Sequence, residues 1–344
     1  PTVTDNKIVE VAFRLHKKKS SVVFVSKDIN ARLKADSLGM KVRDFEKQKI
    51  NFDELFSGYR EVPVSGEIID NFYKEAELGI ENFGFFPNEF VMLKNKANEK
   101  QTAMGAAKDA NTLRHLNGSF ENAWNIKPLN REQRIAMELL LDTSINIVTL
   151  VGQAGSGKTL LALAAALETC HRHKQYDKIL VTRPIVPLGK DIGYLPGDKE
   201  EKLAHWMQPI FDNLSYLMRS EKNSYDKEAQ SAQSKVERLL KNHVVEMEAL
   251  TYIRGRSIPK QYVIVDEAQN LTPHEIKTII SRAGEGTKMV LTGDPYQIDN
   301  PYLDSNSNGL AYAVDRLKNH PIHGHITLRK SERSKLAAIA ADLL

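Results

Sequence analysis

A run of eight residues near the middle of the chain, GQAGSGKT at 152–159, has the residue types and spacing of a loop that binds phosphate. The run fits G-x-x-x-x-G-K-[ST] at every fixed position. Its glycines let the backbone curl so that several N–H groups point at phosphate oxygens, and the following helix adds the positive end of its dipole. Lys158 can then reach the outer phosphates, and Thr159 can ligate Mg²⁺. The expected nucleotide contacts are Gly152, Gln153, Ala154, Gly155, Ser156, Gly157, Lys158, Thr159 and Leu160.

A second pattern, YVIVDEAQN at 262–270, places two carboxylates directly after four apolar residues. A buried parallel strand would deliver them to the carboxyl edge of its sheet, where ligands bind in open α/β folds. We expect Asp266 to hold Mg²⁺, commonly through water, and Glu267 to direct the attacking water as general base. Acidic residues also follow buried strands as solvated strand ends. The phosphate loop earlier in the chain favours the catalytic interpretation over that alternative.

A third apolar run ends in a polar cluster, KMVLTGDPYQID at 288–299. Gln297 is suited to donate a hydrogen bond to the γ-phosphate or to the lytic water, and so to sense whether the β–γ bond is intact. Asp294 is suited to position that loop. Because Gly-Asp-Pro is strong turn chemistry, an ordinary turn is the alternative, and we favour the sensor.

The elements that must position these residues alternate between strand and helix. Helical patterns separate several of the strand candidates, which predicts an α/β fold with a mostly parallel sheet covered on both faces. This context also favours the phosphate loop over a chance glycine-rich turn. Residues 219–236 are polar without an apolar period and predict a mobile surface insertion. The strand candidates are strong apolar runs at 146–151, 178–182, 261–265 and 288–292, and weaker ones at 243–247 and 325–328.

Composition limits the class of protein. With 344 residues, 41% hydrophobic and 27% charged, the chain predicts a soluble globular protein of more than one domain. Its net charge of +4 permits a nucleic-acid partner without requiring one. A single cysteine, Cys170, excludes internal disulfides, and no apolar run is long enough to cross a membrane, so we expect a cytoplasmic protein. Histidines at 171 and 173 beside Cys170 are better explained as incidental surface than as a metal site.

The first third of the chain is less informative. Residues 1–45 predict a helix, a strand at 21–26 and a second helix ended by Gly39. Residues 50–125 have weaker periodicity, and we expect short strands at 61–69 and 89–94 within a small β-rich linker module. The predicted organisation is therefore 1–50, 51–125 and 126–344.

Five segments together resemble the PhoH family of ATPases. PhoH proteins have a RecA-like core similar to one motor domain of superfamily-one helicases. The resemblance covers residues 126–344 and implies a P-loop ATPase that acts in connection with RNA. Its segments are GQAGSGKT, VTRPIVPLGKDIGYLPGDKEEK (181–202), YVIVDEAQN, LTGDPYQID and LRKSERSKLAAIAADLL.

The first 45 residues resemble the C-terminal part of a PIN-type nuclease domain, through TDNKIVEVAF and VFVSKDINARLKA. PIN nucleases gather three or four carboxylates around Mg²⁺ or Mn²⁺ to cut RNA. By motif position Asp5 and Asp28 match two of them, and helix-cap or strand-end acids are the alternative. The first acidic residue of the family sits on an N-terminal strand that this chain does not contain. We therefore expect an upstream segment, and no nuclease activity from this chain alone.

The resemblance to helicase-like ATPases extends to several further residues. A glutamine at the place of Gln133 reads the edge of adenine in such proteins; a solvated side chain is the alternative. Arg183 can meet the γ-phosphate or a nucleic-acid backbone, and the sequence does not separate the two. Arg254 and Arg256 flank a glycine turn and are candidates for RNA phosphates, or for surface salt bridges.

The last predicted helix is preceded by Arg329 and Arg333, one of which can serve as an arginine finger; we favour Arg333. Two-domain helicases close a second motor domain over the nucleotide, whereas this chain has one. The finger would then come from a neighbouring subunit, which predicts a head-to-tail homo-oligomer. Family resemblance favours a hexameric ring.

These features predict a Mg²⁺-dependent ATPase that binds and unwinds or translocates on RNA, joined to a PIN-type module. A nucleotide-controlled RNA-binding switch with slow hydrolysis is the alternative. A small-molecule P-loop kinase is disfavoured, because Glu267 and Gln297 suit water rather than an acceptor hydroxyl.

Overall fold

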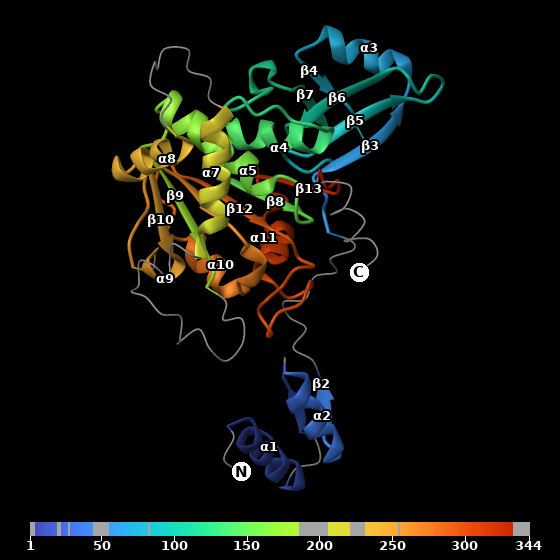
Figure 1. The fold of residues 1–344 in the computed structure, drawn as a ribbon. Coiled ribbons are helices and arrows are strands. Elements are labelled where there is room, and N and C mark those ends of the chain that lie inside the picture. The colour runs from blue at the N-terminus through green and yellow to red at the C-terminus, as the bar shows by residue number, and fades with distance from the viewer. Residues whose placement is uncertain are drawn as a thin grey trace.

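The computed structural model describes residues 4–18, 22–26, 28–43, 55–81, 83–185, 206–220, 231–253 and 255–332. In these ranges the strands form three separate sheets, of six, five and two strands (Figure 1). The α/β fold class predicted from the sequence is confirmed. No helix within the described ranges is both long enough and apolar enough to span a membrane.

The largest sheet is fully parallel, in the order β10-β9-β11-β12-β8-β13. All four strong strand predictions and both weaker ones are confirmed. Its strands are β8 (Ile147–Gly152), β9 (Lys178–Arg183), β10 (Val245–Ala249), β11 (Gln261–Val265), β12 (Lys288–Gly293) and β13 (His323–Leu328).

Helices cover both faces of this sheet (Figure 1). Successive residues of β11 alternate between the two apolar cores, Tyr262 and Ile264 in one and Val263 and Val265 in the other. A strand buried on both faces reads as a continuous apolar run, which is why the sequence revealed it. One face carries α4 (Arg131–Leu141), α5 (Lys158–Leu167), α7 (Gln208–Ser220) and α8 (Ala232–Lys241); the other carries α9 (Leu250–Ile253), α10 (Pro273–Ile280) and α11 (Gly309–Leu317).

A β-rich module precedes the large sheet, as predicted, but one of its strands was predicted too long. The chain turns into helix α3 (Gly66–Lys74) inside the expected strand 61–69, because Ile69 and Phe72, three residues apart, pack on the module's own core. The expected strand at 89–94 is confirmed. The five strands, in spatial order, are β3 (Tyr59–Val64), β5 (Phe90–Asn95), β6 (Thr102–Ala107), β7 (Thr112–His115) and β4 (Glu77–Gly79).

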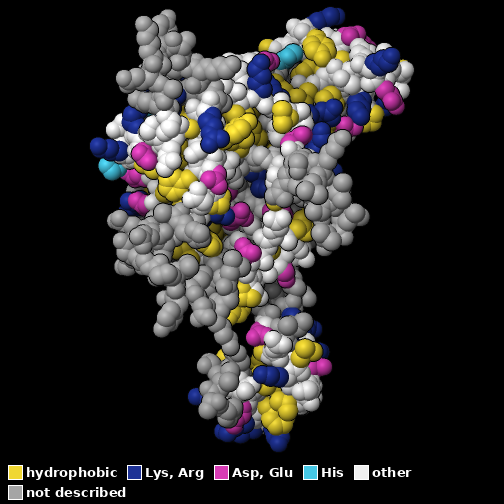
Figure 2. All heavy atoms as spheres, viewed as in Figure 1, with side chains coloured by type: hydrophobic (Ala, Val, Ile, Leu, Met, Phe, Trp, Pro, Cys, Tyr) yellow, Lys and Arg dark blue, Asp and Glu magenta, His cyan; other side chains and the backbone are white. Residues whose placement is uncertain are grey.

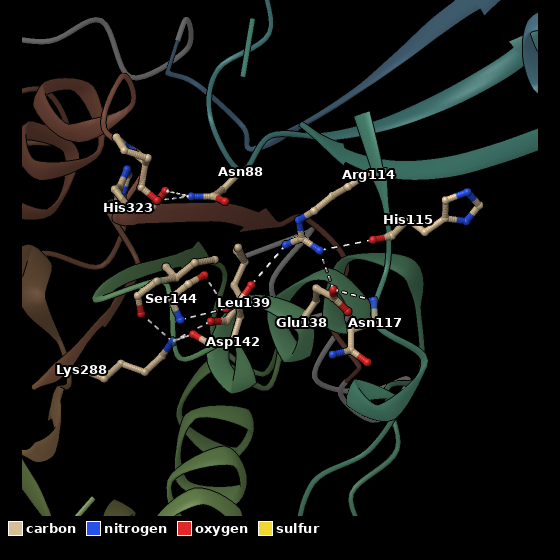
Figure 3. A network of polar contacts seen from close by, with 12 residues as sticks. Asn88, Arg114, His115, Asn117, Glu138, Leu139, Asp142, Ser144, Lys288 and His323 are labelled. Atoms are coloured by element: carbon tan, nitrogen blue, oxygen red, sulfur yellow. Dashed lines mark hydrogen bonds and ion pairs between the residues drawn. The ribbon is translucent and has the colours of Figure 1, made fainter. Parts of the chain in front are cut away.

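Figure 3 shows how this module is joined to the large sheet. Arg114 of β7 pairs with Glu138 and Asp142 of α4, at 3.4 and 3.2 Å. Asn88 donates its side-chain N–H groups to the carbonyl oxygens of Pro321 and His323, at 2.8 and 2.9 Å. The module is therefore held to the amino edge of the large sheet by side chains that cross between the two.

The N-terminal unit is a small two-stranded parallel sheet with two helices. The predicted order of helix, strand and helix is confirmed, and Gly39 ends the second helix with a φ of 76°. A core of Val9, Phe24, Ala31, Ala35 and Met40 holds the unit together. Its elements are α1 (Thr4–Lys18), β1 (Val23–Val25), α2 (Ile29–Ser37) and β2 (Lys41–Arg43).

The predicted insertion at 219–236 is wrong at both ends. Helix α7 extends to Ser220 and α8 begins at Ala232, with Val236 buried. The apolar residues that bury α8 lie at and beyond the end of the polar stretch, so its helical period was hidden. Residues 221–230 and the helix predicted after Arg333 lie outside the described residues.

Candidate nucleotide site

Strand order brings the three predicted motifs together. Strand β12 lies between β8 and β11, so the loops that follow these three strands meet at one edge of the sheet. They carry the phosphate loop, the paired acids and the predicted sensor. Ligands bind at this carboxyl edge in open parallel sheets, as the sequence led us to expect.

The phosphate loop needs its glycines. Gly155 and Gly157 have φ values of 80° and 90°, a left-handed region that side chains disfavour. A Cβ at Gly152 would lie 2.3 Å from the carbonyl oxygen of Leu328. Lys158 begins helix α5 and donates to the carbonyl oxygens of Gly152 and Gln153, at 2.7 and 2.9 Å. The ammonium group therefore lies within the loop itself.

The first of the paired acids contacts the phosphate loop directly. The hydroxyl of Thr159 donates to Oδ1 of Asp266 at 2.8 Å, and the hydroxyl of Thr292 donates to the same oxygen at 2.6 Å. Asp266 is buried. A threonine of the phosphate loop and a carboxylate more than one hundred residues later thus meet on the α5 face of the sheet.

The second acid sits on a left-handed backbone. Glu267 has a φ of 56°, an uncommon conformation for a residue with a side chain, of the kind that clusters at functional sites. Its Oε2 accepts from Nε2 of Gln269 at 2.6 Å. Burial, and then the charge of Asp266, raise the pKa of Glu267, while Gln269, Arg183 and Lys158 act in the opposite direction. A raised pKa suits a carboxylate that takes a proton from water.

Family comparisons agree with this geometry. The PhoH-like protein family matches residues 125–343, and a PIN domain family matches residues 2–46. The chain belongs to the PhoH family. It is 47% identical to protein PhoH2 of Bacillus subtilis, over 99% of this chain and 77% of that protein, and 35% identical to protein PhoH2 of Mycolicibacterium smegmatis, over 99% and 74%. A PhoH-like protein of Bacillus subtilis is 38% identical over 49% of this chain and 48% of its own length.

Family and geometry together identify a P-loop NTPase-type enzyme, built on the parallel sheet β10-β9-β11-β12-β8-β13. A PhoH domain with this loop uses a nucleotide and a divalent metal. Oxygen ligands from Thr159 and Asp266 fit Mg²⁺, which takes one or two protein groups plus phosphate oxygens. Among the described residues no cluster of three or more His, Cys, Asp or Glu could hold a metal alone, so the nucleotide would have to complete the set.

Gln269 is a residue of the PhoH domain that sequence reasoning missed. Its buried amide donates to Glu267 and, at 2.9 Å, to the carbonyl oxygen of Gln297, and it accepts from the N–H of Asp294 at 3.1 Å. It therefore links Glu267, the predicted general base, to the predicted sensor loop. The only sign of Gln269 in the sequence is its position two residues after Glu267. A search for charged side chains does not find it, because its amide is neutral.

Asp294 and Gln297 occupy different places on that loop. Oδ2 of Asp294 accepts from the N–H of Ala154 at 3.1 Å, which ties the sensor loop to the phosphate loop. The predicted positioning role of Asp294 fits this contact. Gln297 is exposed, and its backbone carbonyl oxygen accepts from Gln269; the sensor role of its side chain stays a prediction.

The structure places Gln133 against the phosphate loop. Its Nε2 donates to the carbonyl oxygen of Ser156 at 3.1 Å, and its Oε1 accepts from the N–H of Leu129 at 2.8 Å. The side chain is buried, so the solvated alternative is wrong. An adenine contact would require these bonds to be exchanged, and it stays a prediction. Asn130 is the N-cap of α4, and its side chain accepts from the N–H of Gln133.

The arginines singled out in the sequence lie in different places. Arg183 lies among the paired acids, 3.4 Å from a carboxylate oxygen of each. Arg256 pairs with Glu248 at 2.5 Å, which is the surface salt bridge named as its alternative. Arg254 and Arg333 lie outside the described residues. The backbone of Arg329 donates to Glu132 at 2.7 Å, beside the phosphate loop.

The predicted acids of the PIN-like unit gain less support. Oδ1 of Asp28 accepts from the N–H groups of Asn30 and Ala31, at 2.7 and 3.2 Å, and caps helix α2. This contact fits the helix-cap alternative, and the metal role of Asp28 stays a prediction. Asp5 lies in α1, and its side chain is outside the described residues.

Proposed function

We propose that this PhoH protein couples Mg²⁺-dependent ATP hydrolysis to the binding and unwinding of RNA. One observation carries the hydrolytic part: the 2.8 Å hydrogen bond from Thr159 to Asp266, which joins the phosphate loop to the paired acids. This pairing puts a metal-binding hydroxyl and a carboxylate beside the amides that would hold a triphosphate.

The chain's own residues account for the proposed hydrolysis. Lys158 exchanges the carbonyl oxygens of its loop for those of the outer phosphates. Glu267 accepts the proton of a water that attacks in line with the β–γ bond, and Gln297 orients that water. Arg333 of a neighbouring subunit supplies positive charge to the transition state. When bound, Mg²⁺ at Thr159 and Asp266 neutralises charge on the phosphate oxygens.

Support for RNA is indirect. The net charge is +4, and Lys and Arg side chains lie among Asp and Glu on the face shown in Figure 2, without one basic stripe. Arg254 and Arg256 remain the proposed phosphate contacts, for which Arg256 would have to leave Glu248. The position of Arg183 beside Asp266 and Glu267 supports a role at the nucleotide site. We extend the proposal to the organisation 1–50, 51–125 and 126–344, in which the PIN-like unit belongs to a ribonuclease module and this chain alone does not cut RNA.

The test is the rate of ATP hydrolysis with RNA, with DNA and with neither, at stated salt, because phosphate contacts weaken steeply as salt rises. We expect RNA to stimulate the rate, and Lys158→Ala to abolish it. Near-normal turnover by Lys158→Ala would contradict the assignment of the site. Light scattering tests the proposed hexamer, since full activity in a monomer excludes a finger in trans.

Strand displacement separates unwinding from the alternative of a nucleotide-controlled switch. A tailed RNA duplex is offered with ATP or with a non-hydrolysable analogue. Displacement with ATP alone supports unwinding. Equal displacement with both would favour the switch and overturn the mechanical part of the proposal.

A further inference from the structure

The chain has two tryptophans, and an arginine lies over each. The guanidinium carbon of Arg183 is 5.6 Å from the centre of the Trp206 ring, and that of Arg172 is 4.9 Å from the Trp124 ring. Each arginine also pairs with a glutamate. The first arrangement stands at the nucleotide site and the second on the helical layer away from it, so the chain contains its own control.

Arg183 is shared between the site and Trp206. Its Nε lies 3.4 Å from Oδ2 of Asp266, and its Nη2 lies 3.4 Å from Oε1 of Glu267. Its Nη1 donates to the carbonyl oxygen of Trp206 at 3.0 Å. The side chain is only 13% exposed, so it faces the acids rather than a ligand on the outer surface.

The charges explain why an arginine is needed here. Two adjacent carboxylates at one strand end repel each other, and the repulsion is strong where water is partly excluded. A guanidinium stays charged when buried, and its planar fork reaches both carboxylates, which an ammonium group cannot do. Its Nε makes no hydrogen bond to any described residue. The guanidinium is therefore held by charge, by the bond from Nη1 to the carbonyl oxygen of Trp206 and by the indole.

Trp206 connects this arginine to the helical layer. The next residue, Met207, is fully buried, and helix α7 follows and packs on α5, which begins with Lys158. Trp206 therefore lies between the paired acids and the packed helices α5 and α7. A movement of the acids or of these helices changes the surroundings of the indole ring.

We propose that Arg183 and Trp206 form a positioning pair, in which Trp206 holds the guanidinium that fixes Glu267 toward its water. The inference rests on the proposed ATP hydrolysis. It assigns Arg183 to the alignment of the general base, and it makes Trp206 an internal reporter of the site.

The kinetic test replaces each arginine with methionine, which retains much of the stem without the charge. We expect Arg183→Met to lower kcat by about 10–100-fold, which is typical when a residue that orients a site side chain is removed. The KM for ATP should stay nearly unchanged. Arg183→Lys, which keeps the charge without the fork, should recover part of that loss. Arg172→Met is the matched control and should retain wild-type kcat. Equal losses in Arg183→Met and Arg172→Met, or none in Arg183→Met, would overturn the assignment.

The spectroscopic test does not depend on turnover. Trp124→Phe leaves Trp206 as the one tryptophan, and Trp206→Phe leaves Trp124. We expect Mg²⁺ with a non-hydrolysable ATP analogue to change the emission of Trp124→Phe in a saturable way, and to leave that of Trp206→Phe unchanged. Adding Arg183→Met to Trp124→Phe should abolish the change while a fluorescent nucleotide still binds.

The two proposals fail in distinguishable ways. Binding of the nucleotide without any response of Trp206, or a response that survives Arg183→Met, would sink the positioning pair and leave ATP hydrolysis standing. A clear response of Trp206 in a protein that never turns over ATP would instead remove the proposed function. Thermal unfolding of every variant, compared with wild type, separates either outcome from loss of the fold.

Discussion

The two edges of the six-stranded sheet use polar side chains in opposite ways. At the amino edge the buried carboxylate of Glu138 pairs with two arginines and accepts one backbone N–H, and buried Lys288 donates to the carbonyl oxygens of Leu139, Asp142 and Ile145 at 2.7–2.9 Å (Figure 3). At the carboxyl edge the hydroxyls of Ser156 and Thr182 have no hydrogen-bond partner among the described residues.

This difference separates stability from ligand binding. A buried polar group left unpaired costs about 1–3 kcal/mol, and is kept where a ligand or an exchange of partners satisfies it. The amino edge therefore joins the β-rich module to the large sheet. The carboxyl edge keeps donors available at the nucleotide site. Substitutions at the two edges should accordingly change different measurements.

Among the substitutions that compare the two edges, Glu267→Gln at the carboxyl edge should have the largest effect on turnover. The amide cannot accept the proton of water, and loss of a general base lowers rates by about 10²–10⁴-fold. Glutamine has nearly the same volume as glutamate, and the side chain at position 267 is partly exposed. The free energy of unfolding should therefore stay close to wild type. Steady-state ATP hydrolysis and thermal unfolding check the two halves of the prediction.

Glu237→Gln on the exposed face of α8 is the matched control, because it makes the same chemical change away from the edge. It should alter neither measurement. Turnover by Glu267→Gln within a few-fold of wild type would show that this carboxylate is not needed for hydrolysis. The contrast between the two edges would then be wrong.

How far the sequence predicted these edges depends on the range of each interaction. Glycines and a lysine at fixed spacing describe a local loop, so the phosphate loop was recognisable. Apolar runs predicted all six strands of the large sheet. Nothing local marks Glu138 and Lys288 as buried, because the segments that cover them, around Arg114 and Leu139, lie more than twenty residues away. Gln269 was missed for the same reason: its partners lie on another loop.

Glu138→Ala at the amino edge should destabilise the protein by about 3–5 kcal/mol, because it leaves Arg114 and Arg134 beside each other without their shared carboxylate. Chemical denaturation measures the loss. Affinity for a fluorescent nucleotide, measured below the unfolding transition, should remain at the wild-type value. Weaker nucleotide binding without loss of stability would show that the edges are not separate.

Acid should weaken the amino half of the sheet through two buried histidines. Burial lowers the pKa of His323 to about 4 and that of His325 to about 3. Between those values and the ordinary histidine value near 6.5 the unfolded chain binds more protons, so stability falls as pH drops below about 6.5. For His323 alone the loss approaches roughly 3 kcal/mol near pH 4.

The free energy of unfolding against pH tests this. His323→Asn, whose amide does not titrate, should lower the slope of the curve between pH 4 and 6.5. Exposed His274 on α10 is the control, and His274→Asn should leave the slope as it is. An unchanged slope in His323→Asn would mean that the buried pair is not what makes this edge sensitive to acid.

The smallest effect is expected at Asn88, where one side chain donates to two carbonyl oxygens across the junction of module and sheet. Asn88→Gly removes those bonds but tolerates the φ of 59°, and should cost about 1 kcal/mol. Asn88→Ala adds the strain of a left-handed backbone and should cost about 1 kcal/mol more. Equal losses in the two variants would show that the backbone relaxes there, and that the amino edge is less rigid than its paired charges imply.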